Sequence, residues 1–541
     1  MVTKIKHYIG LLKKIKFNYV ITSKNSESEN HFIKKLERYK IKWNATNKNI
    51  VLTQIVQDYS TCIKQAAATN YLALKNKSNI GLYSVATQLE DVIFENKFLW
   101  DKLYSEIFYK RLDRIFLSFG GKVIFRNVCQ HKNKKRINEQ FAHIKNQIEK
   151  KEDILHIEIN GLKVGDLVYD TYLRFAHKPT IDLNDPFLDK VIVQSLHICN
   201  SLEQLFLKYN VTALVNTYTS YVHHGLIVRL CLKRNIPVYT VGAFKSIVHK
   251  AVIDFPTHQN NHQYYSGLFK KLDNKEKRLC IAKKSFESRF KGEIDTAIGY
   301  MKESSFSKYY NQELEKLKGN NTVVILAHCF FDSPHIYRDL LFPDFYEWMT
   351  FTLDVLSKDP TINVLVKEHP NGIEGNELVC KELKNKYQEG NITFIDKKTS
   401  NSQLFQMRPQ AIITAYGTAA AEFAYHQIPV ISIYDNPFTS YNFINVSYSI
   451  DQYRKALTNL DDIKTGQNKE EIIEPYYMQN MFFLKGRDSN YLSFNKYRGE
   501  TFSDSFLNDY MPLMNEAYFE MLDVSIQDGF GLCEWEPNSI K

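Results

Sequence analysis

Short apolar runs alternate with longer amphipathic segments through the first half of the chain. The apolar runs are rich in β-branched residues, which is typical of strands buried on both faces of a parallel sheet. We predict strands at residues 49–56, 79–85, 211–216 and 237–241, and helices at residues 58–75, 185–208 and 225–234. Strands that alternate with helices in this way indicate an α/β domain.

The alternation resumes after a charged helical stretch at residues 271–306, where we place the link between two domains. We predict strands at residues 322–327, 363–367, 411–415 and 429–434, and helices at residues 342–356 and 418–427. The expected fold class is therefore α/β, with two Rossmann-like domains on parallel sheets.

The turn that follows the strand at residues 411–415 has the chemistry of a phosphate site. Gly417 lets the backbone come close to a ligand, and Thr418 can cap the next helix and donate its hydroxyl. Ala419 leaves the helix start unobstructed, so free N–H groups and the positive end of the helix dipole point at the turn. Glu422, one turn further on, is placed to accept hydrogen bonds from a ribose diol.

A second polar group follows the strand at residues 363–367. Lys367, His369 and Pro370 come at the end of this strand, so we expect them at the same edge of the sheet as the turn. A cation and an imidazole there complement a diphosphate or a nucleoside monophosphate. A lone histidine beside proline is more often an ordinary loop residue, but the two features in one domain favour a nucleotide site.

A polar and aromatic cluster lies within residues 158–185, where Gly161 and Gly165 indicate turns. Its members are Asp166, Tyr169, Asp170, Tyr172 and Arg174. Aromatic faces stack on sugars and carboxylates accept hydroxyl protons, so the cluster suits an acceptor glycan, with Asp170 as a candidate catalytic base. The alternative is a helix start capped by Asp166, with the other side chains packed between domains.

Two more polar groups follow predicted strands. The loop at residues 217–225 contains His223 and His224, and an imidazole titrates near neutral pH, so His223 is a candidate general base beside acceptor-binding His224. A structural role for at least one of the pair is the alternative. The loop at residues 328–335 supplies Asp332, Ser333 and His335, with Asp332 as a candidate catalytic residue, or else is a plain turn held by Pro334.

These motifs resemble those of a known family. The His-Pro step at residues 369–370, the Gly-Thr-Ala run at residues 417–419, Glu422 and the Pro-Val step at residues 429–430 are similar to bacterial surface-polysaccharide glycosyltransferases of GT-B architecture, above all capsule-biosynthesis Kdo transferases. Bacterial sialyltransferases share a His-Pro motif and a small hydroxyl motif.

The resemblance implies two Rossmann-like domains whose parallel sheets face a cleft. It also implies that the His-Pro and hydroxyl motifs hold the nucleotide of an activated sugar, and that the loop with Asp332 approaches the donor. Other Kdo-transferase motifs are not found, so a CMP-linked sugar is one candidate donor among several.

The charge and the cysteines of the chain indicate which ligands and which cellular compartment suit it. The net charge of +10 is spread along the chain and suits an anionic donor or membrane surface, and no nucleic-acid-binding motif accompanies it. The 8 cysteines form no C-x-x-C pair, which argues against a zinc site and fits a reducing cytoplasm. No apolar run is long enough to span a membrane. The basic residues 1–20 either lie on the inner face of the cytoplasmic membrane or form an ordinary first element.

We therefore predict a glycosyltransferase that moves a sugar from a nucleotide-activated donor to a bacterial cell-surface polysaccharide or lipid-linked glycan. Residues 1–310 would bind the acceptor, residues 311–485 the nucleotide sugar, and helices at residues 486–541 would cross back to the first domain. No D-x-D triplet, the metal-binding motif of the other large glycosyltransferase architecture, occurs, so we expect a metal-independent mechanism. We also expect no cofactor. The alternatives are a polyol-phosphate transferase of the teichoic-acid type and a non-catalytic glycan-binding subunit.

Overall fold

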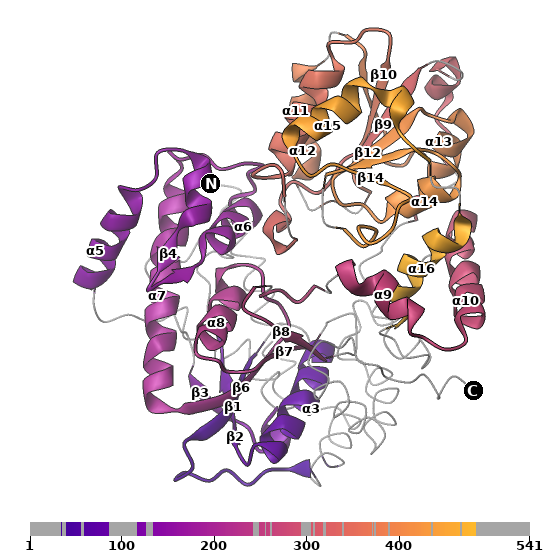
Figure 1. The fold of residues 1–541 in the computed structure, drawn as a ribbon. Coiled ribbons are helices and arrows are strands. Elements are labelled where there is room, and N and C mark those ends of the chain that lie inside the picture. The colour runs from indigo at the N-terminus through magenta and orange to yellow at the C-terminus, as the bar shows by residue number, and fades with distance from the viewer. Residues whose placement is uncertain are drawn as a thin grey trace. The chain divides into compact units, whose positions relative to one another are not determined.

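The structure is a computed structural model whose described residues form two compact units (Figure 1). The structure describes Lys34 and residues 39–55, 59–85, 116–125, 134–241, 248–254, 256–259, 262–293, 304–306, 309–317, 321–337, 340–370, 372, 375–387, 390–433, 436–465 and 468–482. Described residues up to 168 and from 185 to 258 belong to the first unit, and residues 169–184 and 259–482 to the second. The basic segment at residues 1–20 and the predicted helices at residues 486–541 lie outside the described residues, and the predicted domain boundaries stay predictions.

The described part of the first unit includes a six-stranded sheet with the order β3-β2-β1-β6-β7-β8. Its strands are β1 (Asn49–Gln54), β2 (Asn79–Tyr83), β3 (Lys122–Phe125), β6 (Asn210–Asn216), β7 (Val238–Val241) and β8 (Val248–Ala251). All neighbouring pairs are parallel except β7 and β8, which are antiparallel. Nearly every residue of β1 and β2 is buried, which explains their continuous apolar runs.

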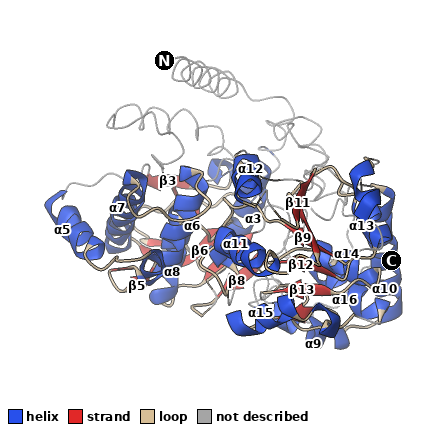
Figure 2. Cartoon of the chain, turned by 90° about the horizontal axis from the view of Figure 1, so that it is seen from above, coloured by secondary structure: helices blue, strands red, loops and turns tan. Residues whose placement is uncertain are grey.

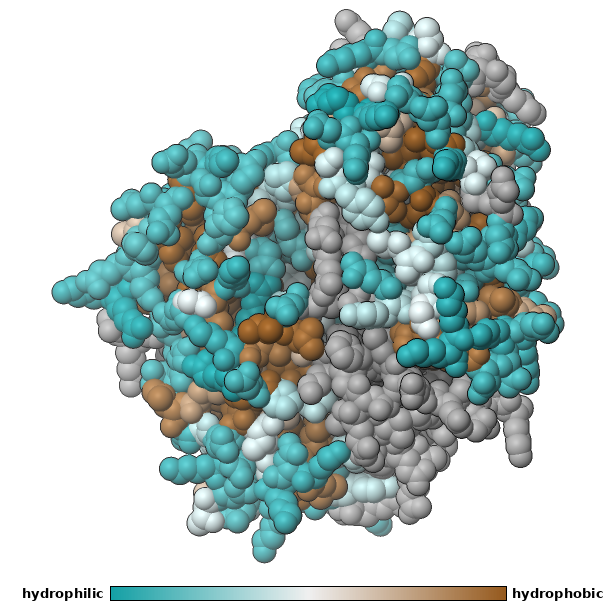
Figure 3. Space-filling model, in the orientation of Figure 1, coloured by the Kyte–Doolittle hydropathy of each residue, from teal (hydrophilic) through white to brown (hydrophobic). Residues whose placement is uncertain are grey.

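The helices of the first unit begin where local chemistry allows. They are α3 (Tyr59–Lys75), α5 (Lys134–Lys145), the start of α6 (Gly165–Ala176), α7 (Pro186–Lys208) and α8 (Val222–Lys233). Helix α7 begins after Asp185, whose carboxylate accepts the N–H of Phe187, with Pro186 in the first turn. Helix α5 buries Ile137 and Ile144. On the face shown in Figure 3, its surface is mostly hydrophilic.

A short hairpin connects α5 to α6. It pairs β4 (Glu158–Ile159) with β5 (Leu162–Lys163), and its two turn residues, Asn160 and Gly161, have φ angles of 53° and 68°. A two-residue hairpin turn requires this left-handed backbone, which glycine and asparagine adopt most readily. Helix α6 then begins in the first unit, and its residues from Tyr169 onward belong to the second.

The described part of the second unit includes a six-stranded sheet with the order β11-β10-β9-β12-β13-β14. Its strands are β9 (Thr322–Leu326), β10 (Asn363–Lys367), β11 (Ile392–Ile395), β12 (Ala411–Thr414), β13 (Val430–Ser432) and β14 (Asn445–Val446). All neighbouring pairs are parallel. Helices lie on both sides of this sheet, with α11 and α12 on one side and α13 and α14 on the other (Figures 1 and 2).

The helices of the second unit besides the end of α6 are α9 (Tyr265–Lys270), α10 (Lys275–Ser288), α11 (Phe345–Leu356), α12 (Asn376–Lys386), α13 (Asn401–Met407), α14 (Ala419–Tyr425), α15 (Ile450–Thr458) and α16 (Lys469–Asn480). Helix α16 packs against α9, α10 and α14. Within the core, the fully buried Trp348 donates its indole N–H to the hydroxyl of Tyr453 at 2.9 Å, which satisfies both polar groups. No described helix has both the length and the apolar character needed to cross a membrane.

The predicted α/β class with two Rossmann-like units is confirmed. In each sheet the first strand is central, the next two lie to one side and the last three to the other, which is the strand order of the Rossmann fold. Two local predictions are wrong. Gly165 is the first residue of α6 and not a turn. Residues 217–225 are not all loop, because Tyr221, at φ 62° and ψ 156°, turns the chain into α8 at Val222, so His223 and His224 lie in its first turn.

Gly225 should be required for the packing of α8. A Cβ atom there would lie 2.5 Å from the Thr219 carbonyl oxygen and 2.5 Å from a Leu167 methyl group. We expect Gly225→Ala to lower the free energy of unfolding by about 1–3 kcal/mol, because a backbone carbonyl cannot move aside easily. The matched control is Gly267→Ala in α9, where nothing lies within 4 Å of the added atom. Equal thermal stability of the two variants would contradict this account.

Candidate functional site

The candidate site of the second unit is the carboxyl edge of its sheet between β9 and β12. The chain builds β10 and β11 on one side of β9 and then returns to place β12 on its other side. At such a switch point the connections leave in opposite directions, and open α/β sheets bind their ligands there. Three of the predicted polar groups follow β9, β10 and β12, so they converge on this edge.

His328 joins the two sides of the switch point. Its Nε2 accepts the backbone N–H of Tyr416 at 2.9 Å, which places the imidazole proton on Nδ1. The ring stacks on Phe345 with centroids 4.6 Å apart and lies 6.5 Å from the ring of His369. Burial, and to a smaller extent His369, lowers the pKa of His328 to about 3. The sequence prediction did not use His328, although it follows a central strand by two residues.

His369 follows β10 and is half-buried, as is Pro370. Burial lowers the pKa of His369 below its ordinary value; Asp332 favours the charged form and Lys367 opposes it. Asp332 lies in the loop after β9 and is exposed. At neutral pH the His369 ring is therefore mainly uncharged and can both donate and accept a hydrogen bond.

Lys367 and Glu422 belong to a buried polar network beneath this edge. The Lys367 ammonium donates to Asn401 Oδ1 at 2.6 Å, and Asn401 Nδ2 donates to Glu422 Oε2 at 3.2 Å. The other oxygen of Glu422 forms an ion pair with Arg289. Each of the four side chains is buried, and Glu422, for which we predicted a ribose contact, is completely so. Burial lowers the pKa of Lys367 to about 8, against the opposing attraction of Glu422.

The turn at residues 415–418 packs closely against Thr414 and Tyr337. A Cβ atom on Gly417 would lie 2.6 Å from the Thr414 hydroxyl, so the absence of a side chain makes room for Thr414. Thr418 makes no capping hydrogen bond, so the predicted cap is wrong, and α14 begins at Ala419. The ring of Tyr416 stacks on Tyr337 with centroids 3.6 Å apart.

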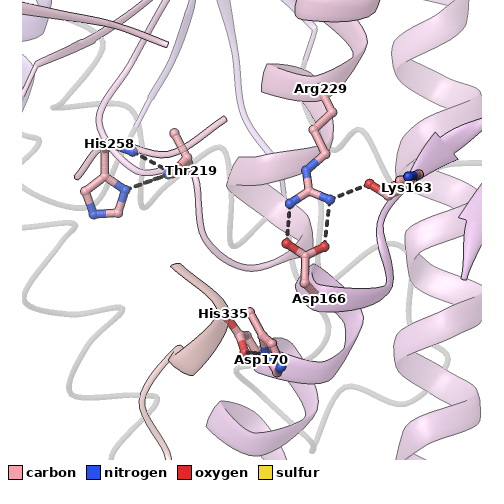
Figure 4. A network of polar contacts seen from close by, with 7 residues as sticks. All are labelled: Lys163, Asp166, Asp170, Thr219, Arg229, His258 and His335. Atoms are coloured by element: carbon pink, nitrogen blue, oxygen red, sulfur yellow. Dashed lines mark hydrogen bonds and ion pairs between the residues drawn. The ribbon is translucent and has the colours of Figure 1, made fainter. Parts of the chain in front are cut away.

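A carboxylate–histidine pair lies elsewhere in the second unit (Figure 4). The almost fully buried Asp170 contacts Nδ1 of His335 at 2.6 Å, which makes Nδ1 the donor if the carboxylate is ionised. The edge of Tyr169 packs on His335, and the Tyr169 hydroxyl donates to Asp344 at 2.6 Å. The ring of His335 is thus oriented by a charge and by packing. Tyr172 is completely buried and Arg174 is half-buried.

The switch point of the first unit lies between β1 and β6, and its described residues include a hydrogen-bonded set of neutral side chains. The His224 Nδ1 contacts Gln54 Oε1 at 2.8 Å, and Gln54 Nε2 donates to the His223 carbonyl at 3.0 Å. Gln65 Nε2 donates to the Gln54 carbonyl at 2.8 Å, and Thr217 donates to Gln65 Oε1 at 3.2 Å. Burial lowers the pKa of His223 to about 3 and holds that of His224 well below 6.5.

Two further sets of contacts hold distant segments of the first unit together (Figure 4). Arg229 forms a bidentate ion pair with Asp166, with one contact at 2.6 Å, and also donates to the Lys163 carbonyl. Asp166 is therefore held by α8, and its predicted acceptor role stays a prediction. His258 and Thr219 hold each other through backbone and side-chain hydrogen bonds of 2.9–3.2 Å. Neither His258 nor Gln54 carried a sequence signal, since each gains its partner only through the fold.

Among the described residues, no group of three or more His, Cys, Asp or Glu side chains is arranged to hold a metal ion. No family model and no curated protein matches the chain.

Several solved structures are similar to this one. KpsC, a β-Kdo 2,4-transferase of Thermosulfurimonas dismutans, is 11% identical, with 49% of this chain and 79% of that chain covered and a TM-score of 0.30. The UDP-N-acetylglucosamine 2-epimerase of Rickettsia bellii is 11% identical over 86% and 98% of the two chains, with a TM-score of 0.24. An α,α-trehalose-phosphate synthase of Burkholderia vietnamiensis is 10% identical over 84% and 99%, with a TM-score of 0.27. Because these scores are low, the fold assignment rests on the strand orders.

Acid should destabilise the second unit partly through His328. Its folded-state pKa of about 3 lies below the ordinary value of about 6.5 for an unfolded chain. Between these values the unfolded chain binds more protons, so the contribution of His328 is complete above about pH 6.5 and is lost as the pH falls. The loss is about 1.4 kcal/mol for each pH unit.

Urea unfolding at about pH 7 and about pH 5 measures this contribution. We expect His328→Asn to reduce the loss of unfolding free energy between these conditions by roughly 2 kcal/mol. The control, His177→Asn, changes an exposed histidine of the same unit and should leave the loss as in the wild type. The same acid sensitivity in His328→Asn as in the wild type would show that His328 is not held neutral by burial.

Proposed function

We propose that the chain is a glycosyltransferase that binds a nucleotide-activated sugar at the switch point of the second unit. The observation that carries the proposal is the convergence of His328, His369 and the Tyr416–Gly417 turn on one sheet edge, above the buried cation Lys367. Imidazole and backbone N–H donors with a nearby cation suit the phosphates of a nucleotide. The likeness of the His-Pro and Gly-Thr-Ala motifs to those of capsule glycosyltransferases supports the same assignment.

In the proposed reaction the oxygen of an acceptor hydroxyl attacks the anomeric carbon of the donor sugar. The bond from that carbon to the phosphate oxygen breaks, and the nucleotide leaves with the electron pair. Donors at the switch point stabilise the negative charge that develops on the leaving phosphate. We assign this role to His369 and the turn at Gly417, Thr418 and Ala419, with Lys367 acting through its charge. The acceptor is a cell-surface polysaccharide or a lipid-linked glycan.

The hydroxyl proton must pass to a base, and the two predicted candidates differ. His223 is held neutral with a pKa of about 3, so it is a weak proton acceptor at neutral pH. Asp170 is hydrogen-bonded to His335, an arrangement that orients an imidazole and stabilises its charged form. We therefore propose that Asp170 and His335 act as the base together.

Nucleotide binding tests the donor site. With purified protein and CMP, UDP and GDP in calorimetry, we expect one nucleotide to bind and His369→Ala to raise its dissociation constant by roughly 10- to 150-fold. The unliganded melting temperature should change little, because a half-buried loop histidine contributes little packing. His177→Asn is the control. Turnover of radiolabelled nucleotide sugar then tests transfer, and phosphorus found in the product would indicate a polyol-phosphate transferase instead.

Turnover by base variants tests the second assignment. Asp170→Asn and His335→Ala should each reduce turnover by roughly 100-fold or more, and the double variant should be no worse than the poorer single variant, because the two side chains act as a unit. Donor affinity should stay as in the wild type. His223→Ala should lose much less activity. A larger loss in His223→Ala than in Asp170→Asn would reverse the assignment.

A further inference from the structure

In the buried network beneath the switch point, the carboxylate of Glu422 pairs directly with Arg289 and not with Lys367. Glu422 forms its ion pair with Arg289, a residue of the short helical turn after α10, and accepts a second bond from Asn401. Among the described residues, Asn401 provides the hydrogen-bond link between Lys367 and this carboxylate, and its Oδ1 accepts from the ammonium. Arg289, Glu422 and Lys367 are 4%, 0% and 3% exposed, so water screens these charges little.

This arrangement leaves the ammonium of Lys367 with an incomplete set of partners. An ammonium has three N–H donors, and within the described part of the chain one of them has a hydrogen-bond acceptor, Asn401. A buried charge without an ion-pair partner is unfavourable. An anion at the edge of the sheet where β10 ends would supply the missing interaction.

We infer that Arg289 is a positioning residue: by holding Glu422, it keeps Lys367 available as the counter-charge of an anionic phosphoryl group at the switch point. The inference rests on the proposed nucleotide site and adds to it a residue outside the sheet and its predicted motifs. Arg289 and Glu422 need not touch the ligand, because they act through the charge of Lys367.

The arrangement predicts proton uptake on binding. Burial lowers the pKa of Lys367 to about 8, so near pH 8 about half of the amine is neutral before a ligand arrives. The titratable groups that act on it are Glu422 on α14, which is paired with Arg289, and His369 after β10, on which Asp332 acts. A phosphate anion favours the ammonium, raises the pKa of Lys367 and makes the protein take up a proton. His369 stays neutral at this pH because its pKa lies below 6.5.

Calorimetry at about pH 8 measures the uptake. CMP and UDP are titrated separately in Tris and in HEPES, whose different ionisation heats report the number of protons exchanged. Both nucleotides are fully ionised at this pH, since their second phosphate pKa is about 6. We expect the wild type to take up a fraction of a proton, and Lys367→Met to lose this uptake and about 10-fold or more in affinity. Lys384→Met, which removes an exposed charge from α12, should behave as the wild type.

Proton uptake and nucleotide affinity in Arg289 variants test the role of this residue. In Arg289→Gln the freed carboxylate of Glu422 can pair with Lys367, which then stays protonated at pH 8, so proton uptake should disappear and affinity should fall. Arg289→Lys should restore both. Removing one partner of a buried pair can prevent folding, so a second variant, Arg289→Met with Glu422→Gln, removes both charges and should keep at least the wild-type uptake.

Nucleotide binding without proton uptake in the wild type, or unchanged uptake in Arg289→Gln, would overturn the inference. If neither nucleotide binds, the inference fails together with the donor site. If a nucleotide binds with the expected uptake but no sugar is transferred, the inference stands and the proposed function fails.

Discussion

The hydrogen bond from the Tyr416 N–H to His328 Nε2 joins the ends of β9 and β12, the strands between which the chain reverses its direction across the second sheet. Connections leave such a point on opposite sides, so the backbone groups at the strand ends lack neighbours from the next strand. Burial keeps the His328 ring neutral, and a neutral imidazole is what this backbone donor requires. The orientation of the turn that begins at Tyr416 depends on it.

The site depends on a network of buried polar groups beneath this edge of the sheet. Four buried side chains, Lys367, Asn401, Glu422 and Arg289, come from β10, α13, α14 and the turn after α10. Such a network is favourable only when its members are all in place, since an unpaired buried charge is expensive. Helix α14 is tied to the α9–α10 region through Arg289 and through the packing of α16. The position of this short helix is therefore set by contacts outside its own strand–helix–strand unit.

The sequence was sufficient for those features that depend on local periodicity. Strands such as β10 and β12 were predicted because both of their faces are apolar, and α7 because it is a long amphipathic segment. Pairings between distant residues could not be predicted. Glu422 has an ordinary place in the first turn of a helix, and its partner Arg289 lies far away in the sequence, so the local pattern gave no sign of the ion pair. The ribose contact of Glu422 stays a prediction.

The start of α8 shows a related limit. Tyr221 adopts a backbone conformation that is rare for a residue with a side chain, and apolar periodicity gives no sign of it. The strain is sustained by long-range contacts around the same loop, such as the hydrogen bond between His224 and Gln54 and that between Thr219 and His258. Asp170 and His335 likewise come together only through the fold.

The two switch points differ in charge, and this difference bears on what each can bind. At the first, the described hydrogen-bonded groups include the amides Gln54 and Gln65, a threonine hydroxyl and a histidine held neutral by burial. At the second, a buried ammonium lies beneath the edge. Neutral donors and acceptors match the hydroxyl groups of a glycan without the cost of displacing a charge, whereas a buried cation gains most from an anion. The buried ammonium agrees with the proposal that the nucleotide binds to the second unit, and the acceptor role of the first unit stays a prediction.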